Sequence, residues 1–175
     1  FADATMENYS LEIGENAFKS CKKLTELVLP VGLTEIATNT FLDCSSLVSI
    51  TVPYTVTKIA VEAFKNCSNL TTIDFAETPE GKTAVGLEIA DGSKKSDQYS
   101  TTYKSPFSNC ASLAEIEFPS RTSYVGGYVF ATNNTIKKVT FPASLTSMGM
   151  SVFESSKGIK EVIFKTYEDG ENAGK

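Results

Sequence analysis

Four acidic residues share a spacing that could in principle support acid–base chemistry. Glu115 and Glu117 stand two residues apart, and Asp74 and Glu26 fall in equivalent columns of similar segments. Two carboxylates can act as a general acid and a general base. These residues alternate with apolar residues such as Ile116, so they should point away from the core, where carboxylates are simply solvated. We therefore expect no catalytic role for them.

Histidine is absent from the 175 residues, and this removes most nucleophilic and metal chemistry. Ser-His-Asp and Cys-His arrangements cannot be assembled without it, and the usual zinc motifs fail for the same reason. The pair Gly126 and Gly127 lacks the rest of a dinucleotide-binding fingerprint. The sequence therefore predicts no catalytic residue, no metal ligand and no cofactor. Enzymatic activity remains an alternative that substrate turnover by the isolated chain would establish.

Cysteine could form disulfides or bind metal, but the four cysteines occupy one repeated position. They are Cys21, Cys44, Cys67 and Cys110, and Asn133 and Ser156 take the same position in two later copies. Equivalent residues of stacked units point the same way rather than at each other, and no C-x-x-C pair is present to hold zinc. We expect four buried, free thiols that act as small apolar fillers.

A phenylalanine recurs along the chain at a fixed interval. It stands at Phe18, Phe41, Phe64, Phe107, Phe130 and Phe153. The intervals are 23, 23, 43, 23 and 23 residues, and 43 equals 23 plus 20. A fixed period of roughly 20 to 50 residues is typical of a solenoid, whose units cannot bury their own apolar faces and stack on one another instead. The sequence predicts such a stack, interrupted by twenty extra residues.

Two apolar columns follow each phenylalanine, nine and eleven residues later. In the first copy they are Leu27 and Leu29. A period of two between aliphatic or aromatic residues predicts a strand with one buried side. The segments TELVLP, VSITVP, TTIDFA, AEIEFP, KKVTFP and KEVIFK should therefore stack into one parallel sheet.

A second aliphatic column lies five residues before the phenylalanines and should close the opposite wall of each coil. Its members are Ile13, Ile36, Ile59, Val125 and Met148, with Leu33, Val56 and Leu145 three positions earlier. The segment around each phenylalanine, such as A-F-x-x-C, is too short for a free-standing helix. We expect one turn of α- or 3₁₀-helix that places the phenylalanine in the core.

The pattern L-x-x-I-x-L-P-x-x-L-T-x-I-x-x-x-A-F-x-x-C resembles the BspA-like class of leucine-rich repeats. The matching residues of one copy are Leu24, Leu27, Leu29, Pro30, Leu33, Ile36, Phe41 and Cys44. The last two copies depart from it at Asn133, Ser156 and Met148. The resemblance implies a mostly-β, right-handed repeat solenoid from a secreted or cell-surface bacterial protein, with a role in adhesion or contact with host proteins.

The repeat divides the chain into five segments. Residues 1–12 should form a partial N-terminal cap, 13–75 and 106–164 the leucine-rich repeats, and 165–175 a polar tail or linker. Residues 76–105 interrupt the register. Within them VGLEI and QYSTTY flank a polar DGSKKSD, which predicts a projecting β-hairpin.

Composition excludes several partners. A net charge of −5 gives no basic stripe, so nucleic acid is not expected. No run of eighteen apolar residues occurs, so nothing should span a membrane. The chain begins at Phe1 without a leader, which favours a processed or excised fragment of an extracellular protein. Its oligomeric state is not indicated.

The outward side chains of the predicted sheet form the first candidate ligand-binding surface. They are Glu26, Val28, Ser49, Thr51, Thr72, Asp74, Glu115, Glu117, Lys138 and Thr140. The second candidate is the insertion, with Asp91, Lys94, Lys95, Asp97, Tyr99 and Tyr103. We expect a protein ligand, such as a host or extracellular-matrix protein, on the sheet face, the insertion or both. The alternative is a structural spacer array that has no ligand of its own in a larger surface protein.

Overall fold

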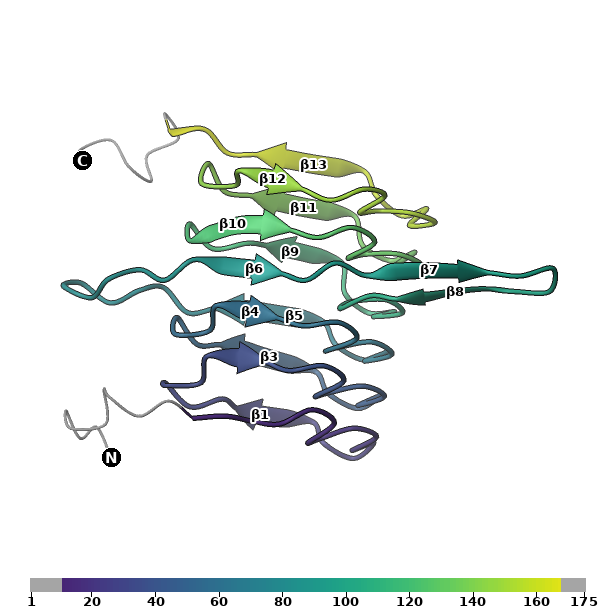
Figure 1. The fold of residues 1–175 in the computed structure, drawn as a ribbon, viewed down its shortest axis with the longest axis horizontal. Coiled ribbons are helices and arrows are strands. Elements are labelled where there is room, and N and C mark those ends of the chain that lie inside the picture. Colours follow the sequence, from purple (N-terminus) through teal and green to yellow (C-terminus); the bar gives the residue numbers. More distant parts are fainter. Residues whose placement is uncertain (1–10, 168–175) are drawn as a thin grey trace.

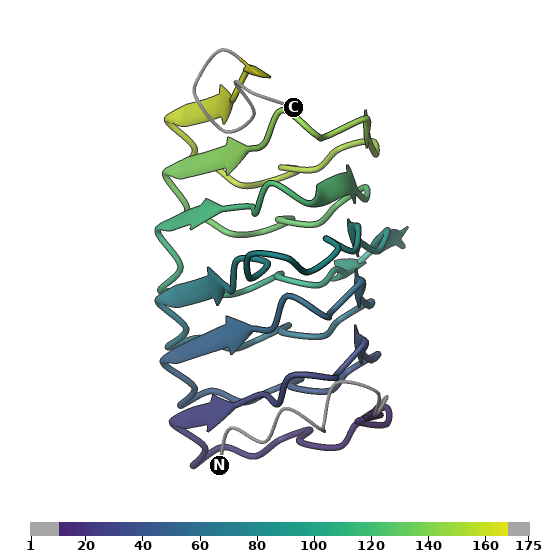
Figure 2. The ribbon, with the colours of Figure 1, turned by 90° about the vertical axis from the view of Figure 1, so that its left-hand side faces the viewer.

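The computed structural model describes residues 11–167, so most of the expected cap at 1–12 and tail at 165–175 lies outside it. The chain forms a mostly-β solenoid in which successive coils stack in one direction (Figures 1 and 2). We number the coils 1 to 6 by their phenylalanines, from Phe18 to Phe153.

The period-two segments form strands along one side of the solenoid, which we call the strand face. Its strands are β1 (Glu26–Val28), β3 (Ser49–Val52), β5 (Thr72–Phe75), β9 (Glu115–Glu117), β11 (Lys138–Phe141) and β13 (Glu161–Phe164). They are stacked in one column in Figure 2, and each pairs in parallel at the repeat register, for example Ile50 with Ile73. The expected single sheet is divided, however, into β1-β3-β5 and β13-β11-β9.

The return wall is a second parallel sheet, which the sequence did not predict. Its order is β12-β10-β6-β4-β2, and its strands are β2 (Glu35–Ile36), β4 (Lys58–Ile59), β6 (Leu87–Ile89), β10 (Thr122–Val125) and β12 (Ser147–Met148). Most of these strands have only two residues, so period-two alternation cannot show in the sequence. They form because coils stacked at strand spacing bring backbone groups into bonding distance, as between Ala90 N and Ile59 O at 2.9 Å.

The segment around each phenylalanine forms turns, and the expected turn of α- or 3₁₀-helix is wrong: within residues 11–167 no α-helix occurs, and none of these segments is 3₁₀-helical. Residues two before or two after the phenylalanine adopt positive φ, between 52° and 65°. They are Asn16, Ser20, Asn39, Asp43, Glu62, Asn66, Asn109, Tyr128, Thr132, Ser151 and Ser155. Two left-handed residues four apart prevent a right-handed helical turn, and asparagine is among the residues that tolerate this conformation best.

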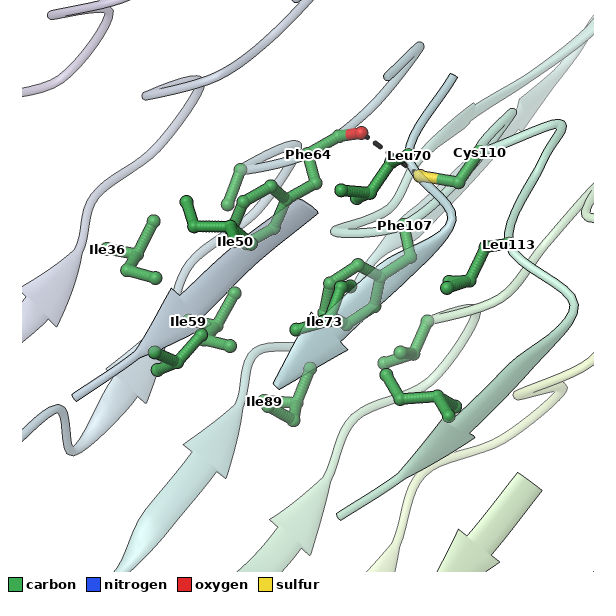
Figure 3. Close-up of a cluster of buried hydrophobic side chains, with 14 of the residues drawn as sticks. Ile36, Ile50, Ile59, Phe64, Leu70, Ile73, Ile89, Phe107, Cys110 and Leu113 are labelled. Atoms are coloured by element: carbon green, nitrogen blue, oxygen red, sulfur yellow. Dashed lines mark hydrogen bonds between the residues drawn. The ribbon is translucent and has the colours of Figure 1, made fainter. Parts of the chain in front are cut away.

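The phenylalanines form a continuous aromatic column through the core. The rings of Phe41 and Phe64 stack with centroids 5.3 Å apart, and those of Phe64 and Phe107 with centroids 5.6 Å apart. Figure 3 shows Phe64 and Phe107 side by side, with Ile50 and Ile73 packed beside them. The insertion therefore leaves the aromatic column unbroken.

The small residue three positions after each phenylalanine has a role beyond filling space. The Sγ of Cys67 donates to the carbonyl of Phe41 at 3.2 Å, and Cys110 bonds Phe64 in the same way (Figure 3). Asn133 and Ser156 donate to equivalent carbonyls, which explains why they replace cysteine. All four cysteines are free thiols.

The expectation that all four thiols are buried is wrong for one of them. Cys21 lies in coil 1 and is exposed, whereas Cys44, Cys67 and Cys110 are buried. Each buried thiol is covered by the preceding coil, as Cys44 is by the carbonyl of Phe18 at 3.0 Å. Position in the stack, rather than position in the repeat, decides whether the thiol is exposed.

The insertion differs from the predicted hairpin at 76–105. VGLEI is not a hairpin strand: Leu87 and Ile89 are fully buried in β6, between β4 and β10. The polar SKKS is not a turn but β7 (Ser93–Ser96), which pairs antiparallel with β8 (Thr101–Lys104). Sequence reasoning failed because Ile89 of LEI is the residue of the second aliphatic column in coil 4, but it does not stand five residues before the phenylalanine.

The twenty extra residues are therefore two separate insertions. The interval from Ile59 to Ile89 is 30 residues, which is 23 plus 7, and the interval from Ile89 to Phe107 is 18, which is 5 plus 13. The first insertion is a loop between β5 and β6. The second is the β7–β8 hairpin, which extends beyond the turns of the coils (Figure 1).

Candidate functional site

Most residues predicted for the ligand-binding surface do lie exposed on the strand face. The exposed ones are Glu26, Val28, Ser49, Thr51, Thr72, Asp74, Glu115 and Glu117, while Lys138 is half-buried. Val28 is 90% exposed. The strand pairings align Ser49 with Thr72 and Thr51 with Asp74, so outward residues of successive coils are direct neighbours.

Thr140 is the exception and is a wrong prediction, since it is only 5% exposed. Its strand neighbours are Glu117 in coil 4 and Ile163 in coil 6. Glu117 forms an ion pair with Lys165 at 2.7 Å, which joins coil 4 to coil 6 across the intervening strand. Thr140 stands at an outward position of the alternation, and we attribute its burial to this ion pair, which spans its strand.

The strand face is interrupted between coils 3 and 4. At the junctions on either side, an N–H at the strand entry donates to the carbonyl of the equivalent residue one coil earlier: Thr71 to Val48 at 2.9 Å, and Lys137 to Ala114 at 2.7 Å. Within residues 11–167 the equivalent bond from Ala114 to Thr71 is missing, and β5 and β9 are not paired. We call this break the strand seam.

The seam opens outward into a groove of about 350 Å³. Its floor comes from the inward columns and comprises Ile73, Phe75, Ile116 and Phe118. The rings of Phe75 and Phe118 lie 5.7 Å apart but are tilted by 40°, whereas those of Phe118 and Phe141 stack within 7°. The ring stacking of this column is therefore irregular at the seam, where β5 and β9 are also unpaired.

The rim of this groove is acidic. Four carboxylates and one ammonium line it: Asp74, Glu77, Glu115, Glu117 and Lys138. The ammonium of Lys138 lies 3.7 Å from Glu161, which belongs to β13 and is not part of the groove lining. In the described part of the chain Asp74 and Glu115 have no ion-pair partner.

Two of the candidate residues in the insertion stabilise their own loops. The Asp91 carboxylate accepts hydrogen bonds from the Tyr124 hydroxyl at 2.8 Å and the Gly127 N–H at 2.7 Å. Asp97 accepts from the backbone N–H groups of Tyr99 and Ser100 at the hairpin tip, and these bonds lower its pKa. Both aspartates therefore hold the local backbone in place.

Two others attach the hairpin to the stack. Lys94 forms an ion pair with Glu154 of coil 6, and the Tyr103 hydroxyl donates to the same carboxylate at 3.0 Å. The Lys94 hydrogen bond is the main cause of a lowered pKa of Glu154, and Glu154 in turn raises the pKa of Lys94. Tyr103 is buried and its ring lies 6.2 Å from that of Tyr128. These contacts fix the hairpin against coils 5 and 6.

Lys95 and Tyr99 are the remaining candidates of the insertion, and both side chains point to solvent. Tyr99 is 87% exposed. Lys95 alternates with Lys94 along β7, so it lies on the hairpin face away from Glu154. Of the six predicted residues, only these two are free for a ligand.

A family model described as the BspA type leucine rich repeat region matches residues 1–83 and 94–170 in 6 copies. The chain belongs to this leucine-rich repeat family. No curated protein matches the sequence. Solved bacterial structures share the fold, and one, from Faecalibacterium prausnitzii, is described as a leucine rich cell surface protein.

That structure has 23% identity and a TM-score of 0.60, over 81% of this chain and 32% of its own. The leucine-rich repeat protein of T. pallidum has 25% identity and a TM-score of 0.64, over 92% of this chain and 70% of its own. A leucine-rich repeat protein of Eubacterium ventriosum has 19% identity and a TM-score of 0.60, over 82% of this chain and 32% of its own. The chain thus spans about a third of the length of two of these proteins.

Within this BspA-type chain, polar side chains link the outer turns in a ladder that sequence reasoning missed. Asn66 donates to Asp43 at 2.7 Å, Asn109 to Asn66 at 2.9 Å, and Thr132 to Asn109 at 2.9 Å. These residues all stand two positions after the phenylalanine, so the period itself could have shown the column. The ladder borders a shallow hollow of about 710 Å³, but its donors and acceptors bond one another.

Arg121 is a second residue that sequence reasoning missed. Its side chain is 7% exposed, and its guanidinium donates to the carbonyls of Val56 at 2.5 Å and Pro53 at 3.1 Å. Burial lowers its pKa, while the charge of Glu77 partly opposes the shift. Gly86 occupies the position in coil 4 that Arg121 occupies in coil 5, and it has no side chain. The arginine therefore reaches past coil 4 to coil 3. No periodic pattern marks such a long contact.

The family and its fold are typically non-catalytic. Over residues 11–167 no three His, Cys, Asp or Glu side chains are grouped so that they could hold a metal ion. In the same range no helix is long and apolar enough to cross a membrane.

Proposed function

We propose that the chain is a non-catalytic protein-binding or adhesion module of a bacterial cell-surface protein, and that its ligand lies on the strand face. The observation that carries this proposal is the exposed, regularly spaced strand face, which contains an open groove at the seam. A broad sheet suits a protein or extended ligand better than a small molecule. A host or extracellular-matrix protein is the class of partner we propose.

The hairpin would contribute a second contact through Lys95 and Tyr99. Tyrosine supplies a large contact area at low entropic cost. Because Lys94 and Tyr103 anchor the hairpin to Glu154, the tip is presented in a fixed position rather than on a free loop. A preorganised loop loses less entropy on binding.

The alternative is a spacer that has no ligand. It is favoured by one observation, namely that four of the six predicted residues of the insertion make contacts within the chain itself. The hairpin would then serve only to brace coils 5 and 6.

Surface plasmon resonance against a panel of purified extracellular-matrix proteins separates these functions. Thr51→Arg with Thr72→Arg changes the centre of the strand face, and Thr57→Arg with Thr146→Arg makes the same chemical change on exposed positions of the return wall. Binding that falls about tenfold or more only in the first pair supports the proposal. Binding that survives both pairs but is lost with Lys95→Ala and Tyr99→Ala would place the ligand on the hairpin. A spacer predicts no binding to any member of the panel.

A further inference from the structure

Among the junctions within residues 11–167, only the strand seam lacks a ladder on the strand face. The return wall continues through it, since β6 pairs with both β4 and β10. The phenylalanine column also continues, at 5.6 Å between Phe64 and Phe107. Only the strand face is open there, so two parallel strand edges face each other across the groove.

These edges carry backbone groups without protein partners. Regular coils satisfy the carbonyl at the strand entry with an N–H from the next coil, as Val48 is satisfied by Thr71. In the described chain the carbonyl of Thr71 and the N–H of Ala114 lack that bond. An unpaired strand edge is a template for an extended segment, and main-chain hydrogen bonds are the usual source of affinity in such contacts.

The charge of the rim selects the chemistry of the occupant. Asp74 and Glu115 have no ion-pair partner among residues 11–167, and they flank the groove from opposite edges. The two lysines at the rim are already paired: Lys138 lies 3.7 Å from Glu161, and Lys165 lies 2.7 Å from Glu117. A cationic side chain would meet two carboxylates, while its aliphatic stem would lie over Ile73 and Ile116 on the floor.

We propose that the strand seam binds an extended, basic segment of a partner protein. An arginine or lysine enters the groove between Asp74 and Glu115, and the adjacent backbone of the segment bonds the Thr71 carbonyl and the Ala114 N–H at the strand entry. This inference rests on the proposed protein-binding function and names its site and ligand class. Arginine suits the groove better than lysine because its fork of donors can bond carboxylates and carbonyls together.

Fluorescence anisotropy with labelled eight-residue peptides tests the proposal on the whole chain. The peptides alternate threonine with arginine, with glutamine or with glutamate, so only the charge changes. We expect the arginine peptide to bind at least about tenfold more tightly than the glutamine peptide, and the glutamate peptide not to bind. Equal binding of the arginine and glutamine peptides would overturn the proposal.

A matched pair of variants separates a specific groove from general acidity. Asp74→Asn with Glu115→Gln removes the two groove carboxylates, and Glu12→Gln with Glu88→Gln removes two exposed carboxylates away from the strand face. Both pairs change the net charge equally. The groove pair should weaken the arginine peptide about tenfold or more, and the control pair should leave it within about twofold. Equal weakening by both pairs would show nonspecific attraction and refute the site.

Amide NMR of the unaltered chain gives a readout that does not depend on the variants. Addition of the arginine peptide should shift the amides of 72–75 and 114–117, and should slow the exchange of the Ala114 N–H with solvent. If the shifts instead map to the hairpin at 93–104, the seam is refuted while the protein-binding function stands. If neither the basic peptides nor the matrix proteins bind, the function and the site both fail.

Discussion

Replacement of Phe107 by alanine should split the unfolding of the solenoid into two steps. Phe107 is fully buried, and its ring stacks at 5.6 Å on Phe64 and at 5.6 Å on Phe130. Removing a buried phenylalanine costs about 3 to 5 kcal/mol, which is a large part of the stability of a typical domain. In a solenoid the core of each coil packs mainly against its two neighbours, so the loss falls on the junctions of coil 4.

The junction between coils 3 and 4 is the most weakly coupled of those in the described chain. The strand face adds no ladder hydrogen bonds there. Coupling therefore depends on the phenylalanine stack, the β4–β6 ladder, the bond from Cys110 to the Phe64 carbonyl and the outer-turn bonds, such as those from the Phe64 N–H to Pro106 and from Asn109 to Asn66. Phe41→Ala is the matched control. Its ring is equally buried and stacks at 5.4 and 5.3 Å, but the next junction keeps both ladders, β3–β5 and β2–β4.

The buried thiols report on the two halves separately. Cys44 and Cys67 lie in coils 2 and 3, and Cys110 lies in coil 4. Pulsed alkylation across a urea titration, read by peptide mass spectrometry, should show two midpoints in Phe107→Ala, one for Cys110 and one for the N-terminal pair. Phe41→Ala should lower stability without separating Cys67 from Cys110. If all three thiols of Phe107→Ala became reactive at one urea concentration, the seam would not be the weak junction and the reasoning would be wrong.

Three further predictions follow from the insertion and the thiols. Deletion of 92–104 restores the interval of five residues between Ile89 and Phe107 and should give a folded chain. Urea unfolding should show a free energy of unfolding lower by about 1 to 2 kcal/mol, because the lost packing of Tyr103 exceeds the gain of about 1 kcal/mol from closing a shorter loop. Thiol titration should count one reactive group, Cys21, in the native chain and four after denaturation, since burial raises the pKa of Cys44 to about 11 and that of Cys110 to about 12. The pKa of Glu154 is lowered from 4.5 in the folded chain, so its ion pair with Lys94 stabilises the docked hairpin fully above pH 4.5. This stabilisation should be lost as the pH falls through the lowered pKa of Glu154. The NMR shifts of the Tyr103 ring would follow the loss.

Each of these has a control. Deletion of a segment that includes β6 should abolish folding; a folded product would show that Leu87 and Ile89 are dispensable. Cys21→Ser should leave no native thiol reaction, and any residual reaction would contradict the burial of the others. Glu154→Gln should remove the acid transition of the Tyr103 ring, and an unchanged transition would assign it to another carboxylate.

The sequence predicted the solenoid because its evidence is positional. A residue that must enter a shared core recurs at every coil, so the phenylalanine at 41 and the aliphatic pair at 50 and 52 could be recognised without knowing the coordinates. The return sheet and the left-handed turns could not be recognised in this way. The strands of the return sheet are mostly two residues long, and the turn residues range from Asn39 to Glu62 and Tyr128, so no single residue type marks them.

The candidate site was predicted less completely for a related reason. Period-two alternation shows which side chains point away from the core, but not which of these are buried by other side chains. Thr140 is covered by the Glu117–Lys165 ion pair, and Lys94 and Tyr103 are engaged by Glu154, which lies 60 and 51 residues further along the chain. These contacts depend on how distant coils are placed, which a repeat pattern read one copy at a time does not contain.

The two insertions explain why the seam can exist without unfolding the chain. The seven extra residues of the first insertion enter between β5 and β6, and the hairpin enters between β6 and Phe107, so each lies where the chain turns outside the core. The return ladder and the phenylalanine column therefore keep their register through coil 4, while β5 and β9 remain apart over the tilted rings of Phe75 and Phe118. Stability at this junction comes from the return wall, the outer turns and the core, which leaves the strand face free to hold a ligand. Substitutions at Asp74 and Glu115 should accordingly change binding and leave the unfolding midpoint nearly unchanged, and a large loss of stability in either would mean that the groove carboxylates belong to the structure rather than to the site.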